Sequence, residues 1–438
     1  MQRASQPRSA FWSAAPLVSR IVTFGAAATV VAGLSIRAAT GKLGTDLPPF
    51  VMAWSPRVSP LAALSGVTLA ASALVAPRAA RALRPAAFAA FLFGLGLTLG
   101  LGINLARHGV HDWYAIFDTS PGGSFEAPNE YLPGLPELSY GVRFFLDRFA
   151  EMVPAAPVNV AGHPPGLLLS LHVLGISTAK NMAALCLGVG ALTAPLSYDL
   201  GRTLLGDERG RSAGLLAAFA PSLLVFGVTS ADYLYTALGL ASAALLTRAR
   251  PTPRLLGAAA AAVAAFFSWL LLALPAWAAI VVWRREGPRA ALLLLAACGL
   301  ALAALNGALA LWVGYDAIGA LHATGSVYHH SIARVRPYEF WVFGSPTAWA
   351  VMGGLALAAP ALRALAAREP AAVALAAVIA VSAVLGFTKA ETERIWLPFV
   401  PLLCVAASAG LPSRRLSPVL WLLAAQALAV ELLFQTIW

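Results

Sequence analysis

Long apolar runs alternate with short arginine-rich breaks along most of this chain. Most of the runs approach or exceed the roughly 20 apolar residues that a helix needs to cross a bilayer. Only helices and closed barrels satisfy their backbone hydrogen bonds in lipid, so runs of this length predict helices. The predicted spans are 16–38, 59–77, 86–105, 179–199, 211–228, 231–247, 289–313, 346–367, 371–387, 394–410 and 416–435. We therefore expect an all-α polytopic membrane protein with about 11–13 transmembrane helices.

Two apolar stretches do not fit single spans. Residues 164–176 are too few to cross a bilayer at about 1.5 Å per residue, and are expected to be re-entrant or half-spanning. Residues 255–283 are too long for one span and short for two, with Ser268-Trp269 in the middle. This second stretch is expected to form a tight hairpin of two short helices.

Composition supports a membrane protein. Of 438 residues, 59% are hydrophobic and 11% are charged, against about 25% charged residues in soluble proteins. The three cysteines, Cys186, Cys298 and Cys404, lie within apolar stretches and show no disulfide or zinc spacing. The first run, between Arg20 and Arg37, is interpreted as a retained span and not as a signal peptide. We expect a single transmembrane domain, 1–438, without a soluble domain.

The arginine-rich breaks give the predicted spans a direction. With the N-terminus in the cytoplasm, nineteen of the 30 basic residues but only five of the 19 acidic residues lie inside. The positive-inside rule therefore explains the net charge of +11, and no nucleic-acid partner is expected. All seven histidines then lie outside or in the outer half: His108, His111, His163, His172, His322, His329 and His330. Two long loops, 106–163 and 314–345, are also outside, so function is expected at the extracytoplasmic face.

An amphipathic helix is predicted within the first outer loop, over residues 138–153. Apolar residues recur there with helical spacing at Val142, Phe145, Leu146, Phe149, Met152 and Val153. A second face carries charges at i, i+4 spacing: Arg143, Asp147 and Glu151. Such a helix lies flat in the membrane interface or packs on the bundle as a lid, and both interpretations stay open.

The first outer loop also carries candidates for acid–base chemistry: Asp112, Asp118, Glu126, Glu130 and Glu137. Taken singly, each is typical of a solvated loop charge. Glu130 differs because Tyr131 follows it and His163-Pro164-Pro165 closes the same loop. A histidine before a helix that begins with prolines lies at the positive end of that helix, where it favours a phosphate or simply caps the helix.

A metal site in this loop is a weaker hypothesis. His108-Gly-Val-His111-Asp112 contains two histidines and a carboxylate, which form a usable ligand set. The spacing matches no strong metal signature, so a polar loop is the preferred interpretation. No metal site and no cofactor are assigned, while use of a divalent cation is left open.

Three further polar clusters are predicted at the outer face. Thr229-Ser230-Ala231-Asp232 is typical of a helix-capping turn. The loop 328–341 mixes arginines with aromatic residues, a combination that suits phosphate and sugar or prenyl surfaces, or an interfacial aromatic belt. Lys389-Ala-Glu-Thr-Glu-Arg394 opens a span, and a charged group of this density favours a paired, functional Arg394.

These motifs, in this order, resemble the GT-C superfamily of membrane glycosyltransferases that use polyprenyl-phosphate sugars. The resemblance rests on Asn129-Glu130-Tyr131 in the long first loop and on the His163-Pro164-Pro165 opening. Arg336-Pro337-Tyr338 and the segment 393–398 are similar to those of actinobacterial integral membrane proteins described as glycosyltransferases. The resemblance covers about residues 86–410 and implies a GT-C-like bundle in a bacterial plasma membrane.

The resemblance implies roles for particular residues. Glu130 would be the catalytic base, with Asp112 and Asp118 as rivals. His163, Arg336 and Arg394 would bind the donor phosphate. The remaining predicted substrate contacts are Tyr131, Asp232, His330, Tyr338, Glu391 and Glu393.

The expected activity is inverting transfer of a sugar, such as mannose or another hexose or pentose, from polyprenyl phosphate to an acceptor hydroxyl. The acceptor would be a glycan, glycolipid or protein of the cell envelope. A flippase or transporter of a lipid-linked sugar is the main alternative, although intramembrane charges near the bilayer centre and internal repeats would then be expected. A non-catalytic subunit of an envelope complex is a third interpretation.

Overall fold

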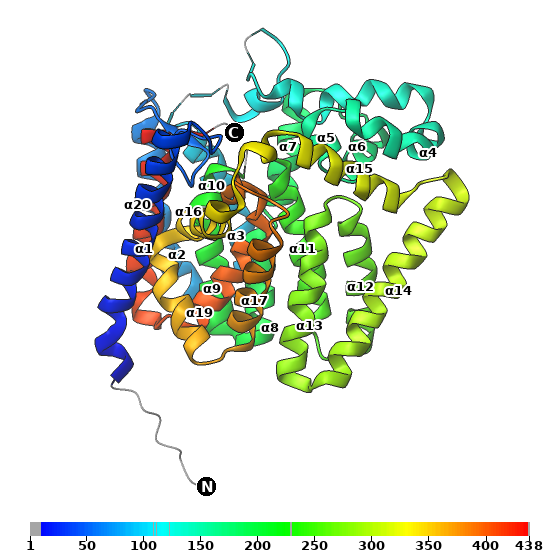
Figure 1. Ribbon diagram of the computed structural model, residues 1–438. Coiled ribbons are helices and arrows are strands. Elements are labelled where there is room, and N and C mark those ends of the chain that lie inside the picture. The colour runs from blue at the N-terminus through cyan, green and yellow to red at the C-terminus, as the bar shows by residue number, and fades with distance from the viewer. Residues whose placement is uncertain (1–9, 108, 111, 122, 228–229, 437–438) are drawn as a thin grey trace.

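The computed structural model describes residues 10–436 except 108, 111, 122, 228 and 229. The described chain is almost entirely helical (Figure 1), with short 3-10 turns between many of the helices. Its α-helices are α1 (Ala10–Thr40), α2 (Ala62–Ala82), α3 (Pro85–Asn104), α4 (Val142–Met152), α5 (Val158–Ala161), α6 (Gly166–Val173), α7 (Ala179–Gly190), α8 (Thr193–Leu205), α9 (Asp207–Phe219), α10 (Pro221–Val225), α11 (Ala231–Leu246), α12 (Pro251–Ala265), α13 (Ala273–Glu286), α14 (Pro288–Val313), α15 (Ala317–His330), α16 (Tyr338–Ala366), α17 (Pro370–Leu385), α18 (Thr392–Ile395), α19 (Val400–Gly410) and α20 (Leu416–Leu433). Two short antiparallel strands, β1 (Met52–Trp54) and β2 (Phe434–Thr436), pair Ala53 with Gln435.

The chain is an all-α polytopic membrane protein. Seven helical segments among the described residues are long and apolar enough to cross a membrane: 22–40, 62–82, 85–104, 179–205, 288–313, 338–366 and 413–433. Shorter apolar helices lie at 231–246, 370–385 and 397–410. The coarse prediction of a polytopic helical protein is confirmed, although several predicted spans prove to be interrupted.

Proline accounts for the clearest interruption. The predicted span 211–228 is broken into α9 and α10, because α9 ends at Phe219 and Pro221 opens the next helix. A proline lacks the N–H that would continue the helix, but it fits the first turn of a new one. The predicted span 346–367 starts too late, since α16 begins at Tyr338 and continues through Pro346.

The two awkward stretches take the predicted short forms. Helix α6 has eight residues, about 12 Å in length, and cannot cross a hydrocarbon core of about 30 Å. Helices α12 and α13 form a hairpin, whose turn contains Phe266. The Gly166 amide donates a hydrogen bond of 2.9 Å to the Phe266 carbonyl, which fastens the start of α6 to that turn.

This contact leads to a prediction about stability. A Cβ at Gly166 would lie 2.3 Å from the Phe266 carbonyl oxygen, which is backbone and cannot rotate away. We expect Gly166→Ala to lower the free energy of unfolding by about 1–3 kcal/mol, as overpacked sites do. Thermal unfolding of the purified protein in detergent measures the change. Gly188→Ala in α7 is the control, because nothing lies within 4 Å of the added Cβ. Equal melting temperatures for the two variants would contradict the prediction.

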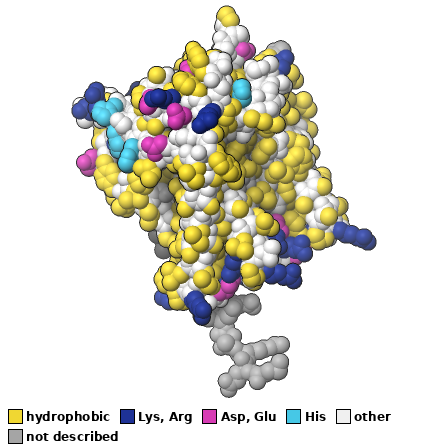
Figure 2. Space-filling view, turned by 90° about the vertical axis from the view of Figure 1, so that its right-hand side faces the viewer, with side chains coloured by type: hydrophobic (Ala, Val, Ile, Leu, Met, Phe, Trp, Pro, Cys, Tyr) yellow, Lys and Arg dark blue, Asp and Glu magenta, His cyan; other side chains and the backbone are white. Residues whose placement is uncertain are grey.

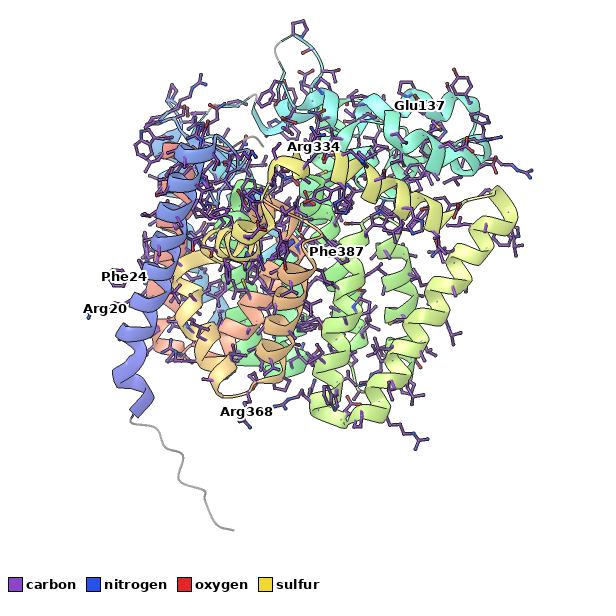
Figure 3. The ribbon with its side chains drawn as sticks, viewed as in Figure 1. Arg20, Phe24, Glu137, Arg334, Arg368 and Phe387 are labelled. Carbon is purple, nitrogen blue, oxygen red and sulfur yellow. The ribbon has the colours of Figure 1, made fainter. Side chains whose placement is uncertain are left out.

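The two ends of the bundle differ in charge. Figure 2 shows mainly Lys and Arg at the lower end of one face, whereas the upper end carries His, Asp and Glu together with Lys and Arg. Arg368 lies at the lower end, whereas Glu137 and Arg334 lie at the upper end (Figure 3). Loops predicted to share a side of the membrane therefore lie at the same end. The assignment of the upper end to the outside rests on the positive-inside rule and stays a prediction.

The first long loop folds across the upper end of the bundle, where α4 and α15 lie over the helices (Figure 1). Helix α4 falls within the predicted range 138–153. Its apolar residues Phe145, Leu146 and Phe149 are buried and pack with Tyr315 and Ala320 in one core cluster. The amphipathic face is therefore covered by protein, which favours the lid over a helix buried in lipid.

Candidate functional site

A buried ion pair lies at the upper end of the bundle. The Arg394 guanidinium donates to the Asp232 carboxylate at 2.7 Å, and the two side chains are 7% and 6% exposed. Asp232 is in the first turn of α11, where the Ser230 side chain caps the helix and also donates to the carboxylate at 2.7 Å. Arg394 is on α18. Burying two charges costs several kcal/mol each, so the pair is kept only where geometry is good or function requires it.

Three more polar groups extend the pair into a network. Glu391 accepts from Arg336 at 2.8 Å and lies 3.5 Å from the Arg394 guanidinium. Arg336 also donates to the Lys389 carbonyl at 2.7 Å, and Lys389 donates back to the Arg336 carbonyl at 2.9 Å. The Nε atom of Arg336 is buried and has no hydrogen-bond partner among the described residues. The two guanidinium groups thus share the Glu391 carboxylate.

The backbone at this network is strained. Ala390 and Glu391 have φ angles of 66° and 59°, in the left-handed region that residues other than glycine rarely adopt. Such conformations cost of order 1–3 kcal/mol and persist where surrounding contacts hold them, often at functional sites. The Arg336–Glu391 and Arg394–Glu391 contacts supply that restraint.

Glu130 is the buried carboxyl of the first loop. It is 2% exposed. Burial raises the pKa of Glu130 to about 8, the Arg394 charge opposes this rise, and the charges of Asp232 and Glu126 add to it. The loop therefore places a titratable carboxyl within electrostatic reach of the Asp232–Arg394 pair.

Tyr131 and His163 are joined as the loop pattern suggested. The Tyr131 hydroxyl lies 3.0 Å from His163 Nδ1, and the Tyr235 hydroxyl donates to Tyr131 at 2.7 Å. His163 Nδ1 also lies 2.8 Å from the Asn159 carbonyl, which only accepts, so Nδ1 carries the proton. Burial lowers the pKa of His163, and its ring is neutral at pH 7.

This tautomer bears on the predicted role of His163 in phosphate binding, which stays a prediction. A neutral ring that donates through Nδ1 presents a lone pair at Nε2. A lone pair accepts a hydroxyl proton, whereas it repels a phosphate oxygen. In this tautomer Nε2 can accept a hydroxyl proton. Arg336 and Arg394 are the predicted phosphate-binding residues that share a contact, through the Glu391 carboxylate.

Glu393 contacts a segment far away in the sequence, and its predicted role in substrate binding stays a prediction. Its side chain is buried, and one carboxyl oxygen accepts from the Val51 amide at 2.5 Å. Burial raises the pKa of Glu393 to about 7. The carboxyl thus anchors the 41–51 loop to the segment that carries Arg394. This contact was not readable from the sequence, since 342 positions separate the two partners.

The other predicted site residues lie outside the network. The Asp118 carboxyl accepts from the Ser120 amide at 3.0 Å, as in an ordinary turn. His330 is exposed and contacts the Ser326 carbonyl, and Tyr338 donates to the Val384 carbonyl at 2.6 Å. The Asp112 side chain lies outside the described residues. None of these three described side chains hydrogen-bonds to the Asp232–Arg394 network.

A metal centre receives no support from the described part of the chain. No group of three or more His, Cys, Asp or Glu side chains is arranged there to hold a metal ion. His108 and His111, which belong to the weaker metal hypothesis, lie outside the described residues.

Tyr235 is a site residue that the sequence analysis missed. It lies in an apolar helix and carries no motif of its own. Asp232 and Tyr235 are, however, three positions apart and share one face of α11. A search for polar partners at helical spacing from Asp232 would have found it.

Comparison of the chain with protein-family models, curated proteins and solved structures found no match in any of the three. The resemblance to GT-C enzymes is therefore not shown by these comparisons.

Proposed function

We propose that this protein is a membrane glycosyltransferase that moves a sugar from a polyprenyl-phosphate donor to an acceptor hydroxyl. The reaction would take place at the upper end of the bundle, on the extracytoplasmic side of a bacterial plasma membrane. The observation that carries the proposal is the buried Glu130 carboxyl within electrostatic reach of the Asp232–Arg394 pair. It combines a proton acceptor with a fixed positive charge in one water-poor site.

Each part of this constellation matches a need of the reaction. The acceptor hydroxyl attacks the anomeric carbon and passes its proton to Glu130 as the new C–O bond forms. The bond between that carbon and the phosphate oxygen breaks, and its electron pair leaves with polyprenyl phosphate. Arg394 and Arg336 would hold the negative charge that develops there, so no general acid is required. A single displacement inverts the anomeric configuration.

Asp232 and Tyr131 would position these groups. The Asp232 carboxylate takes one Arg394 donor and one Ser230 hydroxyl, which fixes where the guanidinium points. The Tyr235–Tyr131–His163 chain of hydrogen bonds restrains the residue next to Glu130. Groups restrained in this way need little reorganisation when charge develops in the transition state.

The direct test uses the purified protein in liposomes with radiolabelled polyprenyl-phosphate sugars, mannose first, and an acceptor membrane extract. Transfer of label to the extract, with release of polyprenyl phosphate, supports the proposal. Movement of the intact labelled lipid between leaflets without transfer would instead establish a flippase. If no sugar of the panel gives transfer or movement, both activities are excluded.

The pH dependence of transfer is a separate prediction. With a pKa of about 8, Glu130 is ionised in only about one molecule in eleven at pH 7. A base acts when ionised, so we expect kcat/KM to rise about tenfold per unit well below pH 8 and to level off above it. Stability should change in the opposite sense, because the raised pKa of Glu130 means that its protonation favours the folded state. The contribution of Glu130 to the free energy of unfolding is full below pH 4.5 and is lost as the pH rises through about 8. Rates and melting temperatures between pH 5 and 9 measure both trends, and a rate that falls with pH would contradict the assigned base.

A further inference from the structure

A pocket of about 450 Å³ opens at the upper end of α1, apart from the ion-pair network. Its volume lies within the range of roughly 300–1,000 Å³ that holds small ligands. The end of α1, the loop that follows it, the β1–β2 pair and the tip of the first long loop form its wall. The residues that line the pocket include Arg37, Asp46, Val51, Phe125 and Gln435.

The wall combines planar polar groups with an aromatic ring. The Arg37 guanidinium donates to the Asp46 carboxylate at 2.5 Å, and their side chains remain 43% and 62% exposed. Phe125 is 70% exposed, and Gln435 on β2 adds an amide that both donates and accepts. A sugar ring has a polar rim of hydroxyls and an apolar C–H face, which suit such planar groups and an aromatic face.

The pocket is joined to the proposed catalytic site on two sides. Phe125 precedes Glu130 by five residues, so their Cα atoms are no more than about 18 Å apart. Hydrogen-bonded turns at Ala127, Asn129 and Glu130 shorten this segment further. On the other side, the Val51 amide that lines the pocket donates to Glu393, the neighbour of Arg394.

We propose that this pocket is a saccharide-binding subsite, which holds a sugar residue of the acceptor while its hydroxyl reaches Glu130. The saccharide class follows from the pocket itself, whereas the acceptor role rests on the proposed function. Arg37, Asp46 and Gln435 bond to hydroxyls, and Phe125 stacks on the sugar face. A glycan acceptor is thus favoured over a protein or simple lipid acceptor.

Binding is measured without donor, so that it does not depend on transfer. Saturation-transfer NMR on the protein in detergent uses a panel of disaccharides of mannose, glucose, galactose and arabinose. Phe125→Ala should weaken binding about five- to tenfold, the scale of one aromatic contact. Phe387→Ala is the matched control, because this ring is also 70% exposed but lies outside the pocket (Figure 3). Arg37→Ala should weaken binding as well.

The outcomes separate this proposal from the proposed function. Binding that is lost in Phe125→Ala and Arg37→Ala but kept in Phe387→Ala and Glu130→Gln supports the subsite, whether or not transfer is found. In a transfer assay, Phe125→Ala should raise KM for the acceptor and leave kcat unchanged. The proposal is overturned if no disaccharide of the panel binds, if Phe125→Ala binds like Phe387→Ala, or if only phospholipid headgroups saturate the pocket.

Discussion

Glu130→Gln is expected to lower the rate of sugar transfer by about 10²–10⁴-fold, the usual contribution of a positioned general base. The amide has the shape of the carboxyl but cannot take a proton. Since burial raises the pKa of Glu130 to about 8, the native side chain is largely protonated at pH 7, and the neutral amide is a close mimic of it. The variant should therefore fold as the native protein does. Initial rates in liposomes and the melting temperature in detergent measure the two properties.

Two carboxylates of the same loop serve as controls. Glu137 is exposed and Asp118 accepts from a turn amide, so Glu137→Gln and Asp118→Asn should retain transfer. A Glu130→Gln variant with the native rate would exclude Glu130 as the base. Loss of transfer in Asp118→Asn instead would move that role to the rival carboxylate.

Breaking the Asp232–Arg394 pair is expected to have the largest effect on stability. Arg394→Ala or Asp232→Ala leaves an opposite charge buried without its partner, and such changes lower the free energy of unfolding by about 3–5 kcal/mol. The double variant removes both charges and should recover part of that loss. The rate of sugar transfer should behave differently. It should fall by about 10²–10³-fold in Arg394→Ala and stay low in the double variant, because the guanidinium that stabilises the charge on the leaving phosphate is missing from both.

The exposed pair on α4 provides the comparison. Arg148 and Glu151 lie 2.9 Å apart with side chains 50% and 68% exposed, so Arg148→Ala should change stability by less than about 1 kcal/mol. Denaturant unfolding of the native protein, Arg394→Ala, Asp232→Ala and the double variant measures the coupling between the two charges. Additive losses in the double variant would show that the two charges are not energetically coupled. Transfer that returns together with stability would show that the pair serves only to hold the fold.

The arrangement also explains why sequence motifs were uneven guides to the site. Glu130, Asp232, Arg336, Glu391 and Arg394 were all candidates and all meet, because charged groups in an apolar chain collect where they can pair. His330 and Tyr338 came from an equally polar loop, yet their side chains bond to nearby carbonyls. Composition marks a polar cluster, but it does not say which side chains turn inward.

Tyr235 and Glu393 illustrate the limits in another way. Tyr235 lies in a mostly apolar helix, and its hydrogen bond to Tyr131 distinguishes it from a packing residue. Glu393 is two residues from Glu391, but it turns to the Val51 amide, while Glu391 turns to two arginines. The left-handed backbone at Ala390 and Glu391 separates these directions, and no local pattern predicts it.

The sequence by itself determined the helical membrane class, most of the spans, the short α6 and the α12–α13 hairpin. These features follow from the length and hydrophobicity of local segments, which the bilayer selects directly. The break between α9 and α10 is also local, because Pro221 opens the second helix. Only the tertiary structure decided that α4 is a covered lid and that Glu130 lies beside Arg394. Those features depend on contacts between segments more than a hundred residues apart, where the energy of burial and pairing is set by the partner and not by the local pattern.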